Sequence, residues 1–340
     1  MPEYAPTKVI RTHLREHPAF QAWQEIESGR VLPQAIATLV ERPGKKGKSA
    51  VYRLESVGPR GSAVIAKRCR QANAHTERTI YEDILPQLPV PPLRYYGFVE
   101  EPDGEFCWLF VECASGEQYS PLIQEHRLLA ARWLALVHST ASTVAASAHL
   151  PDRGPAHYLY HLRSARDTIL RNLGNRALGT GDVLFLRAII SRCDYLEPRW
   201  RQVERFCEGT PRTLVHGDFV GKNVRIRSGQ YGSALLPFDW ETAGWGVPAV
   251  DLAQSALPPT TFLANPELAT YRSLVRGCWP ALDLATIERL ANYGKIFRCL
   301  AAIHWEARSL EYQWVEWPLK NIAVYEAELV DAMRAAGWEA

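Results

Sequence analysis

The feature of this sequence that most restricts its fold is a change of pattern about a third of the way along the chain. Before the change, short β-prone runs alternate with turns, as in residues 50–55 and 62–69 with the turn SVGPRG between them. After Gly116 the apolar residues recur at helical spacing, as in residues 121–140. Strands that precede long helices, rather than alternating with them, are typical of an α+β fold. We therefore predict a small β-rich N-terminal domain and a larger helical C-terminal domain.

We place the boundary between these domains at the short connection that follows the last β-prone run. Residues 1–112 then form the first domain, and residues 113–340 form the second. Within the first domain, residues 1–40 are predicted to be a helix-rich extension that precedes the sheet. A chain of 340 residues is long enough for two parts of this kind, each with its own core.

Composition and charge exclude several classes of protein. Lys and Arg number 39 against 37 for Asp and Glu, a balance that does not suit a protein that coats nucleic acid. The seven cysteines include no C-x-x-C pair, which argues against a zinc ribbon and favours reduced thiols in the cytoplasm. The sequence contains no run of 18 apolar residues, so we expect no membrane span. The sequence leaves the oligomeric state open.

A helix predicted within the N-terminal domain carries an acidic residue on its apolar side. Glu77, Tyr81, Ile84 and Leu88 are spaced four, three and four residues apart, and this spacing places them on one face of a helix. A buried carboxylate is costly unless it has a partner. Lys67, on the preceding β-prone run, is the nearest basic candidate. The alternative is that the glutamate only lies at the rim of the apolar stripe.

The segment LVHGDFVGKNVRIRSGQYGSALLPFDWE, residues 214–241, predicts a β-hairpin with polar residues at its open end. Asn223 begins the first strand and Asp239 ends the second, so the hairpin should bring them side by side, with Asp218 in the loop just before. Hard oxygen ligands of this kind suit Mg²⁺ and do not suit Zn²⁺. His216 is then expected to hold the loop rather than to bind a metal.

These motifs resemble the aminoglycoside phosphotransferase and choline kinase-like superfamily, small-molecule relatives of the protein kinases. The resemblance rests on H-G-D-x-x-x-x-N at 216–223 and D-W-E at 239–241, and GWGVPAVDLAQ at 244–254 is similar to a further segment of the family. Val247 stands where the family usually has Asp, so the contribution of that residue is absent here. The resemblance implies a bilobal protein-kinase-like fold, with a small N-terminal nucleotide-binding lobe and the catalytic loop in the larger lobe.

The resemblance also implies a role for each matched residue. Asp218 corresponds to the catalytic base that orients the acceptor hydroxyl, and Asn223 and Asp239 correspond to the Mg²⁺ ligands. Lys67 is expected to hold the α- and β-phosphates of the nucleotide, with Glu77 positioning it. These roles agree with the chemistry, since phosphoryl transfer needs alignment and charge neutralisation more than covalent catalysis.

Further nucleotide contacts follow from the same resemblance. The loop at residues 44–50, which includes Lys48 and Ser49, is expected to cover the phosphates, although it lacks a clean G-x-G-x-x-G. Glu112 and Ala114 match the hinge whose backbone meets the nucleotide base. Two acidic residues further along the chain are not expected to contact the nucleotide directly. Asp251 resembles a buried acid that braces the catalytic loop, whereas Glu241 could assist metal binding or only support its own loop.

The function implied is Mg²⁺-dependent phosphorylation of a small-molecule hydroxyl by ATP or GTP. An antibiotic or amino-sugar acceptor is the first candidate. Aromatic and acidic residues are interleaved over residues 305–317 and could hold a cationic acceptor, whether an aminoglycoside, a choline-like amine or another amino-alcohol. The same segment could equally be a helix with buried tryptophans. A kinase of a metabolite such as choline, ethanolamine or homoserine is the second candidate. A kinase-shaped binding module without activity is the third, and the presence of Lys67, Asp218, Asn223 and Asp239 argues against it.

Overall fold

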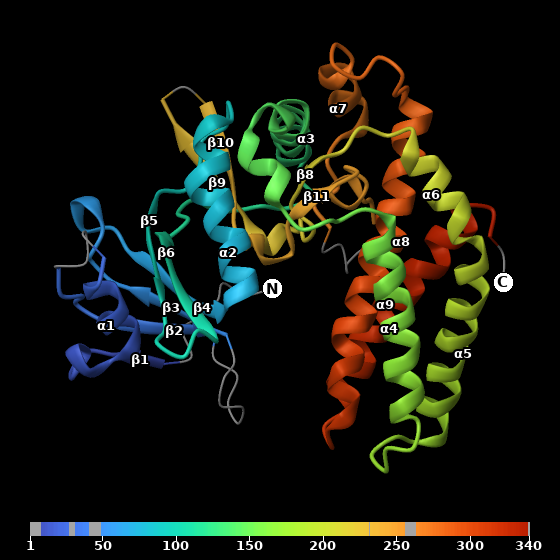
Figure 1. Ribbon diagram of the computed structural model, residues 1–340, viewed down its shortest axis with the longest axis horizontal. Helices are drawn as coiled ribbons and strands as arrows, with labels where there is room; N and C mark the ends of the chain where they lie inside the picture. The colour runs from blue at the N-terminus through green and yellow to red at the C-terminus, as the bar shows by residue number, and fades with distance from the viewer. Residues whose placement is uncertain (1–7, 27–30, 41–48, 231, 256–262, 339–340) are drawn as a thin grey trace. The chain divides into compact units, whose positions relative to one another are not determined.

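The computed structural model describes residues 8–26, 31–40, 49–230, 232–255 and 263–338. The chain divides into two compact units. The first comprises Met1–Gln118 and Lys222–Thr242, and the second comprises Tyr119–Gly221 and Ala243–Ala340. The predicted α+β class is confirmed, because the first unit contains an antiparallel sheet and the second is mainly helical (Figure 1).

The first unit is built on a six-stranded antiparallel sheet in the order β1-β2-β3-β4-β6-β5. Its strands are β1 (Lys8–Ile10), β2 (Ile36–Val40), β3 (Ala50–Leu54), β4 (Val64–Arg70), β5 (Tyr95–Glu100) and β6 (Phe106–Glu112). The expectation of a helix-rich extension over residues 1–40 is wrong for β1 and β2, which extend the sheet. The apolar, partly β-branched run IATLV of β2 is too short to fill helical turns, and its first three residues are buried.

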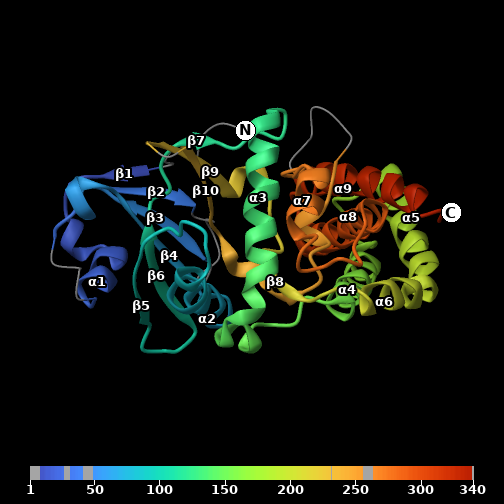
Figure 2. The same cartoon turned by 90° about the horizontal axis from the view of Figure 1, so that it is seen from above.

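Two helices cover opposite faces of this sheet (Figure 2). On one face, α1 (Pro18–Gln24) buries Phe20 and Trp23 against a cluster that includes Ala66 and Phe110. On the other face lies α2 (Gln71–Thr79), where Ala74 packs with the neighbouring cysteines of β4 and β6. Because side chains alternate along a strand, Lys67 lies on the opposite side of β4 from Ala66, on the face that α2 covers.

The hairpin predicted within residues 214–241 is present in the first unit. Strand β9 (Val224–Gly229) pairs with β10 (Gly232–Pro237), and β7 (Glu117–Gln118) pairs with the other edge of β9. The linear boundary after Glu112 assigns this hairpin to the second domain, whereas its contacts group it with the first unit. The domain boundary after Glu112 stays a prediction.

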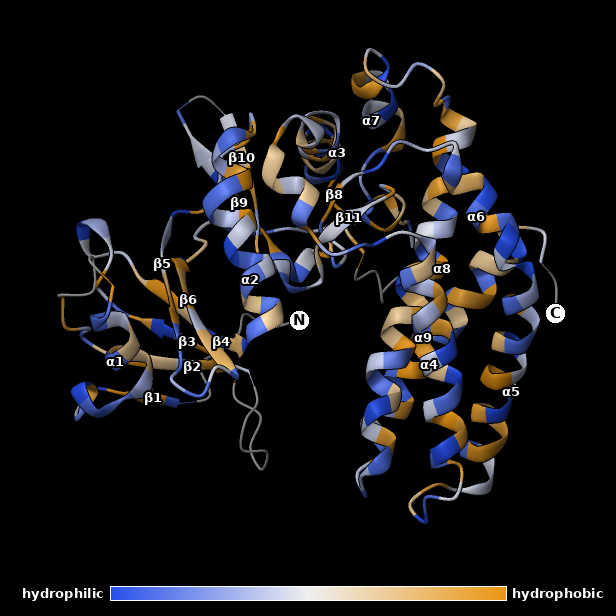
Figure 3. Cartoon of the chain, viewed as in Figure 1, coloured by the Kyte–Doolittle hydropathy of each residue, from blue (hydrophilic) through white to orange (hydrophobic). Residues whose placement is uncertain are grey.

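The second unit is mainly helical. Its helices are α3 (Gln124–Thr140), α4 (Pro155–Asn172), α5 (Thr180–Leu196), α6 (Trp200–Glu208), α7 (Leu268–Val275), α8 (Leu284–Ala307) and α9 (Glu316–Ala335). A two-stranded sheet joins β8 (Thr213–Val215) to β11 (Gly244–Gly246). Helix α8 packs against α4, α7 and α9, and every residue from Tyr293 to Ile303 is buried. In contrast, apolar and polar residues alternate along the outer helix α5 (Figure 3).

The seven cysteines all lie within the described residues, and each is a free thiol. Within those same ranges, none of the helices has both the length and the apolar character that a membrane span requires.

Candidate active site

A buried lysine forms the centre of a polar cluster in the first unit. Lys67 on β4 is 8% exposed, and its Nζ lies 2.5 Å from Oε1 of Glu77 on α2. The ion pair expected from the helical spacing is therefore present. The same Nζ lies 2.5 Å from Oδ1 of Asp239 and 3.4 Å from Oε2 of Glu241. The ammonium group of Lys67 thus contacts three carboxylates.

The electrostatics of this cluster follow from burial and from its excess of negative charge. Burial alone would lower the pKa of Lys67, but the carboxylates of Asp239, Glu77 and Glu241 outweigh it and raise that pKa well above its usual value. Burial raises the pKa of Glu77 to about 7; Asp239 and Glu241 add to this shift, and Lys67 opposes it. The ionised cluster therefore carries three negative charges against one positive charge.

The hairpin and the turn after it place Asp239 with unusual backbone geometry. Its φ is +68°, in the left-handed region that few residues other than glycine adopt. Asp is one of the residues that tolerates this conformation. The backbone amide of Asp239 donates to the hydroxyl oxygen of buried Tyr81, which ties the turn to the helical segment that follows α2. Backbone strain held in this way is typical of functional sites.

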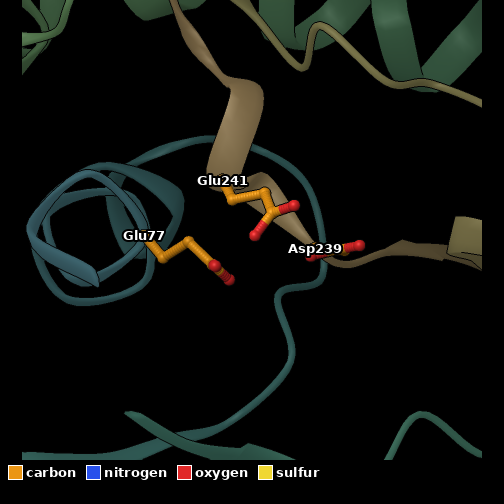
Figure 4. A group of neighbouring side chains, drawn as sticks. All are labelled: Glu77, Asp239 and Glu241. Carbon is orange, nitrogen blue, oxygen red and sulfur yellow. The ribbon is translucent and has the colours of Figure 1, made fainter. Parts of the chain in front are cut away.

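The three carboxylates form a group of potential metal ligands (Figure 4). Glu77, Asp239 and Glu241 each offer an oxygen within 4.8 Å of the others, and their side chains converge on one space. Hard oxygen donors with a net charge of −2, once Lys67 is counted, fit a divalent cation such as Mg²⁺. The amide nitrogen of Phe238 donates to the carbonyl of Asn223 at 3.0 Å, so the hairpin brings the backbone of Asn223 next to this turn.

The second unit holds the loop that follows β8. Both oxygens of the buried Asp251 accept hydrogen bonds from this loop, from the amide nitrogens of His216 at 2.7 Å and Gly217 at 3.0 Å. The amide of Asp218 in turn donates to Nδ1 of His216 at 3.3 Å. Gly217 has a φ of +79°, a conformation that favours glycine. These contacts fix the backbone around Asp218, so Asp251 and His216 brace the loop as expected.

This brace is itself anchored in the core of the second unit. His138 on α3 lies 3.4 Å from Asp251 through Nε2 and 2.9 Å from the hydroxyl of Tyr271 through Nδ1. The hydroxyl of Thr213 on β8 donates to the carbonyl of His138 at 2.8 Å. His138, Tyr271 and Thr213 are all buried. The loop is therefore held by a fully enclosed hydrogen-bond network, which limits its movement.

Asp218 also contacts a basic residue that is distant in sequence. Nη2 of Arg298, on α8, lies 2.6 Å from Oδ1 of Asp218. Both residues are buried, and both belong to the second unit. Sequence reasoning missed Arg298, because its position lies off the apolar stripe of Ile296, Leu300 and Ile303. The apolar residues on all sides of residues 293–303 were the available signal, since they predict a central helix with no exposed face.

Comparison with known proteins establishes the family of the chain. The sequence profile of the phosphotransferase enzyme family matches residues 40–284, well over half of the chain. The chain belongs to the phosphotransferase enzyme family. It is accordingly an enzyme of the small-molecule kinase class, which transfers a phosphoryl group to an alcohol. A sequence comparison with curated proteins gives no match.

Solved structures share the fold of this phosphotransferase at low sequence identity. Choline kinase from Cryptosporidium parvum Iowa II is 12% identical, with a TM-score of 0.60 over 95% of this chain and 97% of that chain. Ethanolamine kinase from Plasmodium vivax is 15% identical, with a TM-score of 0.54 over 86% of this chain and 81% of the other. The GDP and kanamycin complex of aminoglycoside 2″-phosphotransferase IIIa is 13% identical, with a TM-score of 0.58 over 92% and 98%.

The remaining residues expected to bind nucleotide in this phosphotransferase lie in the first unit. Lys48 falls outside the described residues, and Ser49 directly precedes β3. Glu112 ends β6, where its carboxylate accepts from Arg227 at 2.6 Å and from the amide of Arg94 at 3.1 Å. The side chain of Glu112 therefore supports the hairpin, and its amide nitrogen also donates to the carbonyl of Arg94 at 2.8 Å. The hinge role expected of its backbone stays a prediction. Ala114 follows two residues later.

Proposed function

We propose that this phosphotransferase moves the terminal phosphoryl group of ATP or GTP to a hydroxyl of a small organic molecule, with Asp218 as the base. The observation that carries the proposal is the cluster in which Lys67 is shared by Glu77, Asp239 and Glu241. A buried lysine among three carboxylates is unfavourable as a structural feature alone, because the charges do not balance. A divalent cation and a polyphosphate together would balance them.

The nucleotide site follows from this charge arrangement. Asp239 and Asn223 would hold Mg²⁺, and Glu241 is close enough to Asp239 to assist. Bound Mg²⁺ would neutralise the phosphate oxygens and stabilise the charge that develops on them. Lys67, positioned by Glu77, would hold the α- and β-phosphates as a second positive charge. The GDP complex of the structurally similar 2″-phosphotransferase supports a nucleotide as the donor.

The chemical step assigned to Asp218 is proton acceptance. The acceptor oxygen forms a bond to the terminal phosphorus while the bond to the bridging oxygen breaks, and a nucleoside diphosphate leaves. The hydroxyl proton passes to the Asp218 carboxylate, which aligns the oxygen for attack. The hydrogen bonds from the loop to Asp251 support this role, because a base must be held in position to act.

The acceptor has two candidate classes. An antibiotic or amino sugar is the first, supported by the kanamycin complex among the similar structures. A metabolite amino-alcohol such as choline, ethanolamine or homoserine is the second, supported by the choline and ethanolamine kinases. Two of the aromatic residues in the segment 305–317 already meet the protein's own cations. Arg298 lies 5.3 Å from the ring centroid of Trp305, and Lys320 lies 5.6 Å from that of Trp317.

The test is a nucleotide-release assay. The protein is incubated with ATP or GTP, with and without Mg²⁺, and with a panel of kanamycin, spectinomycin, choline, ethanolamine and homoserine, and nucleoside diphosphate release is followed. Mg²⁺-dependent release that one acceptor stimulates supports the proposal and selects the acceptor class. Failure to bind either nucleotide at millimolar concentration in the presence of Mg²⁺ would contradict it.

A further inference from the structure

Arg298 occupies a position that the activity described above does not explain. It lies in the middle of α8, is 5% exposed, and contacts Asp218, which is 8% exposed, at 2.6 Å. Burial has the largest effect on the pKa of its guanidinium and would lower it, but Asp218, Tyr325 and Cys299 together raise that pKa above its usual value, with Asp218 the largest of the three. The residue proposed as the base therefore makes the largest favourable contribution to the charged form of Arg298.

Two aromatic rings hold the same guanidinium from other directions. The ring centroid of Trp305, two helical turns along α8, lies 5.3 Å from Cζ of Arg298, and that of Tyr325 on α9 lies 5.7 Å away. Arginine stacks on aromatic faces and has a rigid planar head, which lysine lacks. The three contacts come from the loop, from α8 and from α9, so they restrict the guanidinium to one place.

A contribution to stability alone does not account for this arrangement. A buried ion pair is often no more stabilising than a pair of well-packed apolar residues, because both charges must be desolvated. The loop around Asp218 is already held by the hydrogen bonds from Asp251. Those bonds are made by the backbone of the loop, whereas the contact from Arg298 is made directly to the Asp218 carboxylate and constrains the orientation of that side chain.

We propose that Arg298 is a positioning residue that holds Oδ1 of Asp218 and thereby turns its other carboxylate oxygen to the acceptor hydroxyl. This inference rests on the proposed role of Asp218 as the base. In the reaction, the hydroxyl proton moves to that second oxygen as the bond between the acceptor oxygen and phosphorus forms. Arg298 neither gives nor takes a proton. We therefore expect substitution of Arg298 to lower kcat and to leave the nucleotide affinity unchanged, because nucleotide binding does not depend on the orientation of this carboxylate.

The test compares Arg298→Gln, Arg298→Lys and Arg298→Ala, assayed with MgATP or MgGTP and the acceptor that gives the highest rate in the panel. We expect kcat to fall about 10- to 100-fold in Arg298→Gln, with the nucleotide KM unchanged. Arg298→Lys should recover only part of this loss. Added guanidinium ion should raise the rate of Arg298→Ala, an effect that loss of packing alone would not produce.

Arg192→Gln is the matched control, because Arg192 forms an ion pair with Glu326 at 2.7 Å in the same unit and has no role in the proposed chemistry. It should leave kcat unchanged. Arg298→Gln combined with Asp218→Asn should be no slower than Asp218→Asn alone. If Arg298→Gln keeps full turnover while Asp218→Asn is inactive, the positioning role is wrong and the proposed function stands. If Asp218→Asn is itself fully active, the proposed function fails as well.

Discussion

At the scale of single residues, two of the buried clusters of opposed charges in this phosphotransferase belong to the proposed chemistry. In the first unit Lys67 is outnumbered by carboxylates, and in the second Asp218 is matched by Arg298. The first arrangement is unbalanced and suits a bound cation. The second is balanced and suits a side chain that must keep one orientation.

Asp239→Asn tests the unbalanced cluster. The substitution removes one of three negative charges and the carboxylate that lies 2.5 Å from Lys67. Because a hard charged ligand is lost, we expect Mg²⁺-dependent ADP binding to weaken by about 10-fold or more, whereas ADP binding without Mg²⁺ changes little. Calorimetric titration with and without Mg²⁺ measures both affinities.

Glu105→Gln is the control for this experiment, since Glu105 is exposed and its carboxylate forms a surface ion pair with Arg70 at 3.2 Å. It should bind ADP as the unmodified protein does. Equal Mg²⁺ dependence in Asp239→Asn and in the unmodified protein would remove Asp239 from the metal site.

The sequence was sufficient for the residues that belong to local motifs. The partnership of Lys67 and Glu77 could be predicted because helical spacing places the glutamate on a buried face. The left-handed backbone of Asp239 and the contact from Arg298 could not. The first depends on the exact turn after β10, and the second depends on packing between α8 and a loop 80 residues earlier in the chain.

At the scale of elements, helix α8 decides how the second unit packs. Gly294 on α8 lies so close to the backbone of Ala249 that an added Cβ would overlap its carbonyl oxygen. Residues 249–250 directly precede Asp251, the buried acid that braces the loop around Asp218. A helical glycine therefore has a packing role here, although glycine normally weakens a helix.

Gly294→Ala should consequently destabilise the protein by about 1–3 kcal/mol, the usual range for overpacking a core. Gly181→Ala is the matched control, because Gly181 lies in α5 with open space around its Cα. It should be neutral or stabilise the protein by up to about 1 kcal/mol. Chemical denaturation measures both changes. A neutral result for Gly294→Ala would show that α8 and residues 249–250 separate more easily than the structure indicates.

Helices α4 and α8 also share a chain of three histidines. Nδ1 of His161 lies 2.8 Å from Nδ1 of His304, and its Nε2 lies 3.2 Å from Nε2 of His157. Burial is the main cause that lowers the pKa of His157 to about 4, of His161 to about 3 and of His304 to about 4. The unfolded chain therefore binds more protons than the folded chain between pH 4 and the ordinary histidine value of about 6.5.

The contribution of these neutral histidines to the free energy of unfolding is therefore fully present above about pH 6.5 and is lost as the pH falls toward 4. His161→Gln should reduce the number of protons taken up on unfolding by about one, which flattens the slope of unfolding free energy against pH. The exposed His149 provides the control, and His149→Gln should leave the slope unchanged. Denaturation curves between pH 4.5 and 7 give these slopes, and an unaltered slope in His161→Gln would contradict the pKa assignment.

At the scale of the whole molecule, the α+β class and the family could be predicted, but the division into units was harder to foresee. Periodicity identified the strands from Ala50 onward and the helices after Gly116. It did not identify β1 and β2, because β1 is an edge strand of three residues and the apolar run of β2 is only five residues long, too short to show a period. It also could not show that the hairpin at 222–242 packs with the N-terminal sheet, since that grouping depends on contacts distant in sequence.

The most direct test of the central claim is turnover by Asp218→Asn. We expect this variant to lose about 1–3 kcal/mol of stability, because an amide oxygen is a weaker partner for the buried guanidinium of Arg298. Assays should therefore be run on protein shown to be folded by its nucleotide affinity. We predict unchanged affinity for the Mg²⁺–nucleotide complex and a kcat lower by about 10³-fold or more. Full turnover by this variant would contradict the account.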